Sequence, residues 1–283
     1  MVKIVAVLVS LLIGAASSYL MYSLGGYNIL TVSLLSLVFA IGAFLVIVIL
    51  FFAFLFFTGF FEGMKKTREY QSSYFRFMLR ILEKFLFSLF GMKNHCTGKD
   101  LISSNETYLF IGNHRSNLDS MILDVYLKDI PLVFIAKKSL FKIPFVRHFI
   151  HGCAYVKLDR NDPKKDFEAI SLAEEMLTRE NKPLSVGVFP EGTRNHSDDP
   201  ANVQEFKPGT FRIIKKTMRP IALFAVRGTK ETNKNLLFKR HHCYVDILEV
   251  IDYDTYKDMD VNEIASYSEN KIREFLKANT KEI

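Results

Sequence analysis

The sequence predicts one α/β domain with a central, mainly β sheet flanked by helices, preceded by a membrane-embedded helical hairpin and an interfacial amphipathic helix. Three observations lead to this prediction. Lys3 is the only charged residue among residues 1–61, so this stretch cannot form the surface of a soluble domain. Residues 62–97 combine many aromatic side chains with several basic ones. In residues 98–283, short apolar runs typical of strands alternate with longer runs of helical spacing.

Residues 1–61 contain two apolar runs that are long enough to cross a bilayer. Residues 4–24 have about the required length, and residues 29–57 exceed it. Lys3, the first run and the small residues "GAASS" also fit a signal peptide. We favour a hairpin of two membrane-embedded helices because the second run follows after only "GGYN".

Charges outside the two runs predict their orientation. Lys3 precedes the first run, Lys65, Lys66 and Arg68 follow the second, and the link between the runs is uncharged. The positive-inside rule therefore predicts that both ends, and everything after residue 61, lie in the cytoplasm. Three scattered cysteines suit reduced thiols in that compartment. We expect an integral protein of the bacterial inner membrane or of the endoplasmic reticulum.

The segment at residues 68–92 predicts a helix that lies at the membrane interface. Its phenylalanine and leucine residues would form an apolar side, while Arg76, Arg80 and Lys84 would face anionic lipid. An ordinary core helix is the alternative, although it would carry fewer basic residues among its aromatics. A bilayer containing anionic lipid is therefore an expected partner.

Strand and helix signals alternate after the interfacial segment. Strands are predicted at residues 108–111, 132–136, 154–158, 184–189, 221–226 and 244–251, and helices at residues 117–128, 163–180, 209–217 and 261–278. Asp162 before Pro163 is a good helix start, since an aspartate cap and a proline in the first turn both favour one. No internal repeat or low-complexity linker divides this region, which indicates a single α/β domain.

The first predicted strand runs into "GNHRSNLD", where His114 lies five residues before Asp119 at a strand-to-helix junction. Ser116 and Asp119 have the spacing of a helix capping box, which would explain the aspartate without any chemistry. A histidine oriented by a carboxylate is the other interpretation, because this pair forms a general base. The junction alone leaves both interpretations open.

Two further predicted strands end in charged residues. The apolar run at 184–189 leads into "PEGTRN", whose turn carries Glu191, Thr193 and Arg194. The run at 154–158 carries Lys157 near its end, and Arg160 follows it. Because the carboxyl ends of strands are where α/β folds present ligand groups, these cations and the histidine pair together indicate a site for an anionic substrate.

"NHRSNLD" at 113–119, followed by "FPEGTR" at 189–194, resembles the glycerolipid acyltransferase family of the 1-acylglycerol-3-phosphate acyltransferases. "AKKSLFKIPF" at 136–145 and "FKPGTF" at 206–211 also resemble family segments, so the resemblance covers roughly residues 98–226. It implies that His114 and Asp119 are the catalytic pair. It also implies that the "EGTR" residues bind the phosphate of the acceptor: Glu191, Gly192, Thr193 and Arg194.

The chain departs from the family pattern at two motifs. The second family motif has an arginine a few residues after a glycine, whereas here "CAYVKLDR" is about two residues longer, so Arg160 or Lys157 is the counterpart. The fourth motif, "PIVPV" in many members, reads "PIALF" at 220–224 and lacks its second proline. Neither departure affects His114 or Glu191, and we expect Glu191 to hold the turn or Arg194 in place.

The resemblance implies transfer of a fatty acyl group from acyl-CoA or acyl-carrier protein to the sn-2 hydroxyl of lysophosphatidic acid, giving phosphatidic acid. His114 would remove the hydroxyl proton and Asp119 would stabilise the imidazolium. The thiolate leaves readily, so no acyl-enzyme is required. Alternatives are a related enzyme for glycerol-3-phosphate or another lysolipid, and a non-catalytic lipid-binding module, which would not need a base.

No cofactor, metal or nucleic acid is implied as a partner. The adjacent His241 and His242 resemble a metal pair, but they begin a predicted strand, in which successive side chains face opposite sides. The expected partners are lysophosphatidic acid, the acyl donor and the membrane.

Overall fold

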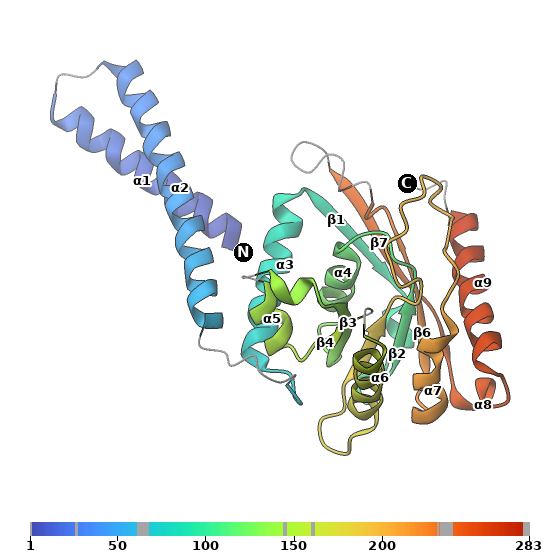
Figure 1. Ribbon diagram of the computed structural model, residues 1–283. Coiled ribbons are helices and arrows are strands. Elements are labelled where there is room, and N and C mark those ends of the chain that lie inside the picture. The colour runs from blue at the N-terminus through green and yellow to red at the C-terminus, as the bar shows by residue number, and fades with distance from the viewer. Residues whose placement is uncertain are drawn as a thin grey trace. The chain divides into compact units, whose positions relative to one another are not determined.

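The computed structural model describes residues 2–25, 28–60, 68–143, 146–159, 162–230, 232 and 240–279. The chain divides into two compact units, Met1–Gly63 and Met64–Ile283 (Figure 1). The first unit is a helical hairpin. The second is an α/β domain built on one sheet.

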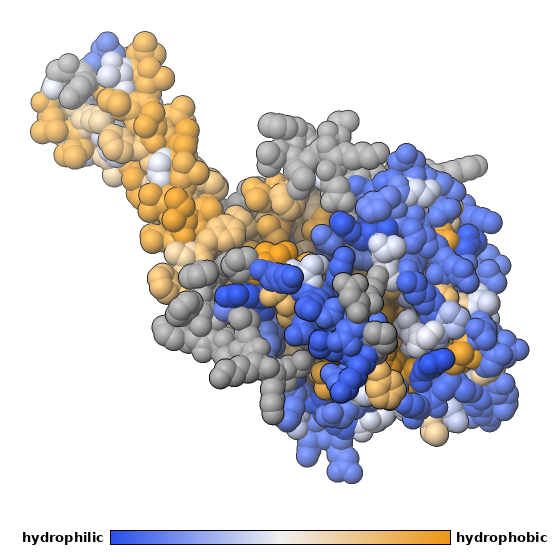
Figure 2. Space-filling view, in the orientation of Figure 1, coloured by the Kyte–Doolittle hydropathy of each residue, from blue (hydrophilic) through white to orange (hydrophobic). Residues whose placement is uncertain are grey.

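The hairpin consists of α1 (Val2–Ser23) and α2 (Ile29–Phe60). Both helices are long and apolar enough to cross a membrane, and they appear almost uniformly apolar in Figure 2. The two helices approach closely at Gly14, where a Cβ atom would lie 3.0 Å from the Cβ atom of Ala40. Most of their large apolar side chains are exposed, which is typical of helices that lipid surrounds.

The sheet of the second unit has the strand order β1-β7-β6-β2-β5-β3-β4, and of the strand pairs that the structure describes only β6–β7 is antiparallel. Its strands are β1 (Met92–Thr97), β2 (Leu109–Gly112), β3 (Leu132–Lys137), β4 (Val156–Leu158), β5 (Ser185–Val188), β6 (Ile221–Arg227) and β7 (His241–Ile251). Every residue of β2, β5 and β6 is buried, which explains why these strands read as continuous apolar runs. The prediction of a central β sheet flanked by helices is confirmed, and the strands of this sheet are mostly parallel.

Helices cover the sheet, with α3, α4 and α5 on one side and α9 on the other (Figure 1). The α-helices of this unit are α3 (Ser73–Leu89), α4 (Leu118–Tyr126), α5 (Val146–Gly152), α6 (Pro163–Thr178), α7 (Arg212–Thr217), α8 (Tyr253–Tyr256) and α9 (Val261–Asn279). The described residues also form the 3-10 helices η1 (Lys99–Leu101), η2 (Leu140–Lys142) and η3 (Pro208–Phe211). As predicted, Asp162 caps α6 by accepting a hydrogen bond from the Lys165 amide.

The edge strand β1 was not expected from the sequence, which assigns Met92 to the end of the preceding helix. Its residues, "MKNHCT", alternate between half-buried and exposed positions, so the strand carries no apolar run. It forms because each of its residues pairs in parallel register with β7. Pairing with a distant strand, rather than local apolar patterning, therefore decides this element.

Two of the three basic residues predicted to face lipid from α3 instead bind α4. Arg80 Nε lies 3.3 Å from Asp124 Oδ2, and Arg76 Nη2 lies 3.8 Å from the other carboxylate oxygen. Arg80 also donates to the carbonyl of Lys128, just beyond the end of α4. The expectation that Arg76 and Arg80 face lipid is therefore wrong, because a buried carboxylate needs their charges. Lys84 is exposed.

We predict that Asp124→Ala lowers the unfolding free energy of the α/β unit by roughly 2 kcal/mol. This is below the usual cost of breaking a buried ion pair, because burial outweighs the two arginines and raises the pKa of Asp124. Chemical denaturation of the full chain in detergent measures the change. Asp129→Ala is the matched control, since Asp129 forms an exposed ion pair with Lys99, and should leave the unfolding free energy essentially unchanged.

Candidate active site

The candidate site lies where the carboxyl ends of β2 and β5 meet. These strands are parallel neighbours, with Ile111 opposite Val188, so the segments that follow them leave the sheet side by side. His114 follows β2, and Glu191 follows β5. The sheet order thus brings together two motifs that are far apart in the sequence.

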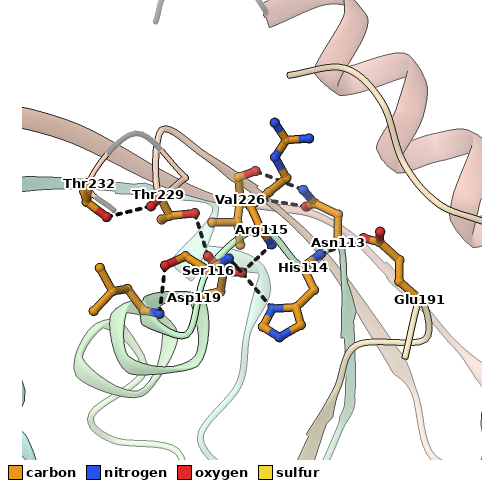
Figure 3. A network of polar contacts seen from close by, with 10 residues as sticks. Asn113, His114, Arg115, Ser116, Asp119, Glu191, Val226, Thr229 and Thr232 are labelled. Carbon is orange, nitrogen blue, oxygen red and sulfur yellow. Dashed lines mark hydrogen bonds and ion pairs between the residues drawn. The ribbon is translucent and has the colours of Figure 1, made fainter. Parts of the chain in front are cut away.

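His114 and Asp119 are in direct contact (Figure 3). The distance from His114 Nδ1 to Asp119 Oδ2 is 2.8 Å, and Asp119 lies in the first turn of α4. Because an ionised carboxylate can only accept, Nδ1 carries the hydrogen and Nε2 has a lone pair for a substrate proton. The histidine side chain is 19% exposed and the aspartate side chain is fully buried, so the ring is the accessible member of the pair.

Asp119 also holds the backbone of the loop that carries His114. Its Oδ2 atom accepts hydrogen bonds from the amides of Arg115 (2.7 Å) and Ser116 (2.8 Å), while its Oδ1 atom accepts one from the Thr229 hydroxyl (2.6 Å). These contacts supply the hydrogen bonds that a buried carboxylate requires. The structural and catalytic interpretations of this motif are therefore compatible, since one carboxylate serves both.

The His114 ring packs against an aromatic cluster. It stacks on Phe189 with a centroid distance of 4.1 Å and an angle of 16° between the planes. Phe189 in turn contacts the rings of Phe134 and Phe224. Stacking on one face and the Nδ1 hydrogen bond at the edge together restrict the rotation of the ring.

Glu191 supports the histidine through its backbone. Its Oε1 atom accepts a 2.7 Å hydrogen bond from the His114 backbone N–H, and Oε2 accepts a 3.2 Å bond from the Gln204 backbone N–H. Burial raises the pKa of Glu191 to about 7. The carboxylate thus joins its turn to the backbone of His114 and of Gln204, and among the described residues it makes no hydrogen bond or ion pair with Arg194.

Two more links close the loop around His114. The Asn113 side chain makes paired hydrogen bonds to the backbone of Val226 in β6, at 3.0 and 2.8 Å. The backbone N–H of Asn195 donates a 2.7 Å hydrogen bond to the His114 carbonyl. His114 is therefore held from β6 on one side and from the segment after β5 on the other.

Two cations lie at the turn that follows β5: Arg194 is part of the turn, and Lys207, which precedes η3, donates its backbone N–H to the Pro190 carbonyl. Arg194 is half-buried, and the Lys207 ammonium reaches over Gly192, where it would lie 2.9 Å from an added Cβ atom. Gly192 has a φ of +75°, a conformation that favours glycine. Within the described part of the chain, neither cation has an ion-pair partner, so both charges can meet a substrate anion.

The structure separates the other cations predicted from the sequence. Lys157 is exposed in β4, the outermost strand at this end of the sheet, which is two strands beyond β5. Arg160 lies outside the described residues, so its contribution stays a prediction. Thr193 is exposed on the turn.

Sequence reasoning missed Thr229 and Lys207. Thr229 has no local signal, because it reaches Asp119 only through the pairing of β6 with β2. Lys207 lies within "FKPGTF", which resembles a family segment, but the resemblance assigns no function to this lysine.

The chain matches known proteins over the same region. A family model described as "Acyltransferase" matches residues 93–227. A 1-acyl-sn-glycerol-3-phosphate acyltransferase of Borreliella burgdorferi is 29% identical over 185 residues, which cover 62% of this chain and 71% of that protein. Its counterpart from Escherichia coli is 29% identical over 197 residues, covering 69% and 77%.

A solved structure has a similar fold. The crystal structure of the 1-acyl-sn-glycerophosphate acyltransferase PlsC from Thermotoga maritima aligns with a TM-score of 0.60 at 22% sequence identity. The alignment covers 82% of this chain and 88% of that one.

We predict that Asp119→Asn lowers kcat by about 10³-fold or more, because the amide cannot stabilise the imidazolium as a carboxylate does. Thermal stability should change little, since the amide oxygen can still accept from both loop amides and the Thr229 hydroxyl can rotate. Initial rates and the unfolding midpoint of the purified protein measure both quantities. Normal turnover with a lowered midpoint would leave Asp119 as a helix cap alone.

Glu191→Gln tests the buried carboxyl through pH. The pKa of Glu191 is raised from its ordinary value of 4.5 to about 7, so between these values the folded chain binds more protons than the unfolded chain. The wild-type unfolding free energy should therefore fall relative to that of the variant as pH rises through this window, by up to roughly 3 kcal/mol. Parallel unfolding curves across this range would contradict the burial of an ionisable group here.

Proposed function

We infer that this chain, which belongs to the acyltransferase family, transfers a fatty acyl group from a thioester donor to the sn-2 hydroxyl of lysophosphatidic acid. The product is phosphatidic acid, and the donor is acyl-CoA or acyl-carrier protein. The observation that carries this proposal is the 2.8 Å contact between His114 Nδ1 and Asp119 Oδ2, which leaves Nε2 of an accessible imidazole as a base.

The proposed reaction needs one base and no covalent enzyme intermediate. His114 Nε2 takes the proton of the acceptor hydroxyl while the oxygen of that hydroxyl attacks the thioester carbonyl carbon. The carbon–sulfur bond then breaks, and the leaving thiolate takes the proton from the imidazolium. Asp119 stabilises the imidazolium between these steps, since its charge lies beside the protonated ring.

Arg194 and Lys207 are our candidates for the acceptor phosphate. Arginine can bind two phosphate oxygens at once, and lysine adds a second positive charge. Both follow β5, the strand adjacent to the one that precedes His114. Lys157 and Arg160 remain candidates for a more distant part of the donor or acceptor.

The hairpin would anchor the enzyme where its acceptor and product reside. The charges that flank α1 and α2 favour a cytoplasmic location for the α/β unit, in the bacterial inner membrane or the endoplasmic reticulum. On α3, Tyr74 and Phe77 are 41% and 59% exposed, and together with Lys84 they suit the membrane interface better than bulk water.

The acceptor is tested by offering purified protein a labelled acyl donor with lysophosphatidic acid, glycerol-3-phosphate, a lysophospholipid or a phosphate-free monoacylglycerol. We predict that lysophosphatidic acid has the highest kcat/KM. Arg194→Ala and Lys207→Ala should each lower that value by roughly 10- to 100-fold, because each removes a charge-assisted contact. Their effect on monoacylglycerol should be within about twofold.

Two controls accompany this assay. His114→Ala should abolish transfer to every acceptor, while Lys164→Ala, at an exposed lysine of α6, should change nothing. Equal losses on acceptors with and without phosphate would remove Arg194 and Lys207 from the phosphate site. Undiminished transfer by His114→Ala would exclude the proposed base.

A further inference from the structure

A pocket of ≈ 530 Å³ opens at the amino-terminal ends of the central parallel strands, whereas the candidate active site lies at their carboxyl ends. It is lined by segments that precede β2, β3, β5 and β6 and by the start of α3. His114 and Glu191 follow the carboxyl ends of β2 and β5, so the length of a strand, roughly 13 Å for four residues, lies between the two places. The pocket shares no residue with the site described above.

The charged groups of this pocket are mainly basic. Arg76, Lys182 and Arg219 line it, and among the described lining residues Glu106 is the single acidic one. Among the described residues, the side chains of Lys182 and Arg219 have neither an ion-pair nor a hydrogen-bond partner. Two positive charges are therefore available to a ligand.

Arg76 adds a buried donor without an acceptor. One of its terminal nitrogens bonds Gln71 and the other pairs with Asp124, but its Nε atom is buried and has no hydrogen-bond partner. A buried N–H without an acceptor is unfavourable by about 1–3 kcal/mol, but this atom has no accessible surface, so Arg76 can act on a ligand only through the part of its side chain that lines the pocket.

The start of α3 contributes in the same sense. Ser73, the first residue of this 17-residue helix, lines the pocket. The N-terminal amides of a helix carry partial positive charge and favour a phosphate or carboxylate. The helix end and the two unpaired cations thus favour the same kind of ligand.

We propose that this pocket is a second anion site, which binds a phosphate group of a soluble phosphate ester or of a phospholipid headgroup. Its walls include Tyr70, Pro183 and Leu184, which suit the carbon skeleton of such an ester. The volume is within the usual range for small-molecule sites. Arg76 contacts both the pocket and Asp124 of α4, the helix that begins with the Asp119 turn, so a bound phosphate would stabilise the packing of α3 on α4.

The test uses the full-length protein in neutral detergent with Arg194→Ala and Lys207→Ala already introduced, so that the proposed acceptor site cannot contribute. Calorimetric titration with sn-glycerol 3-phosphate should give saturable binding. Adding Lys182→Gln and Arg219→Gln should raise Kd at least tenfold, while Lys93→Gln with Lys164→Gln, two exposed lysines outside the pocket, should leave it unchanged. Lys182→Arg with Arg219→Lys keeps both charges and should retain binding.

A second arm identifies the source of the phosphate. The same variants are placed in phosphatidylcholine nanodiscs with and without phosphatidylglycerol, and the unfolding midpoint is measured. A rise with phosphatidylglycerol that Lys182→Gln/Arg219→Gln abolishes assigns the pocket to a lipid headgroup, whereas an effect in the soluble arm alone assigns it to a soluble ester. The proposal is overturned if neither arm responds to these two substitutions. Because the acceptor site is disabled throughout, that outcome would leave the proposed function untouched.

Discussion

The buried carboxylate of Asp119 joins the parts on which the candidate site depends. It accepts hydrogen bonds from the His114 ring, two loop amides and the Thr229 hydroxyl, which belong to the segment after β2 and the segment after β6. A carboxylate with no exposure is stable only when donors surround it. The requirement that these donors converge therefore links the position of the imidazole to the pairing of β2 with β6.

The other neighbour of β2 completes the arrangement. The segment after β5 supplies Glu191, whose side chain binds the His114 backbone N–H, and Asn195, whose backbone N–H binds the His114 carbonyl. His114 and Glu191 thus meet because β5 lies next to β2, although the two motifs are separated by two strands and three α-helices in the sequence. Support from both neighbouring strands gives the imidazole one orientation, which is what proton transfer at a fixed atom requires.

Local patterns identified most elements of the fold. The apolar runs of β2, β5 and β6 mark buried strands, and Asp162 before Pro163 marks the start of α6. The same reasoning failed where the decisive partner is distant. The edge strand β1 has no apolar run. Arg76 and Arg80 have the spacing of lipid-facing residues in the sequence, but in the fold they pair with Asp124 of α4. In each case a contact between elements, absent from any local pattern, decided the outcome.

The sequence by itself determined that two apolar helices precede an α/β domain, and that His114, Asp119, Glu191 and Arg194 belong to strand-end motifs. These properties depend on composition, periodicity and spacing, which are local. Only the tertiary structure decided that Glu191 binds the His114 amide, that Thr229 completes the shell of Asp119, and that Lys207 covers Gly192. The physical reason is that these contacts join segments brought together by strand order, and strand order follows from burial of the whole sheet rather than from any one stretch of chain.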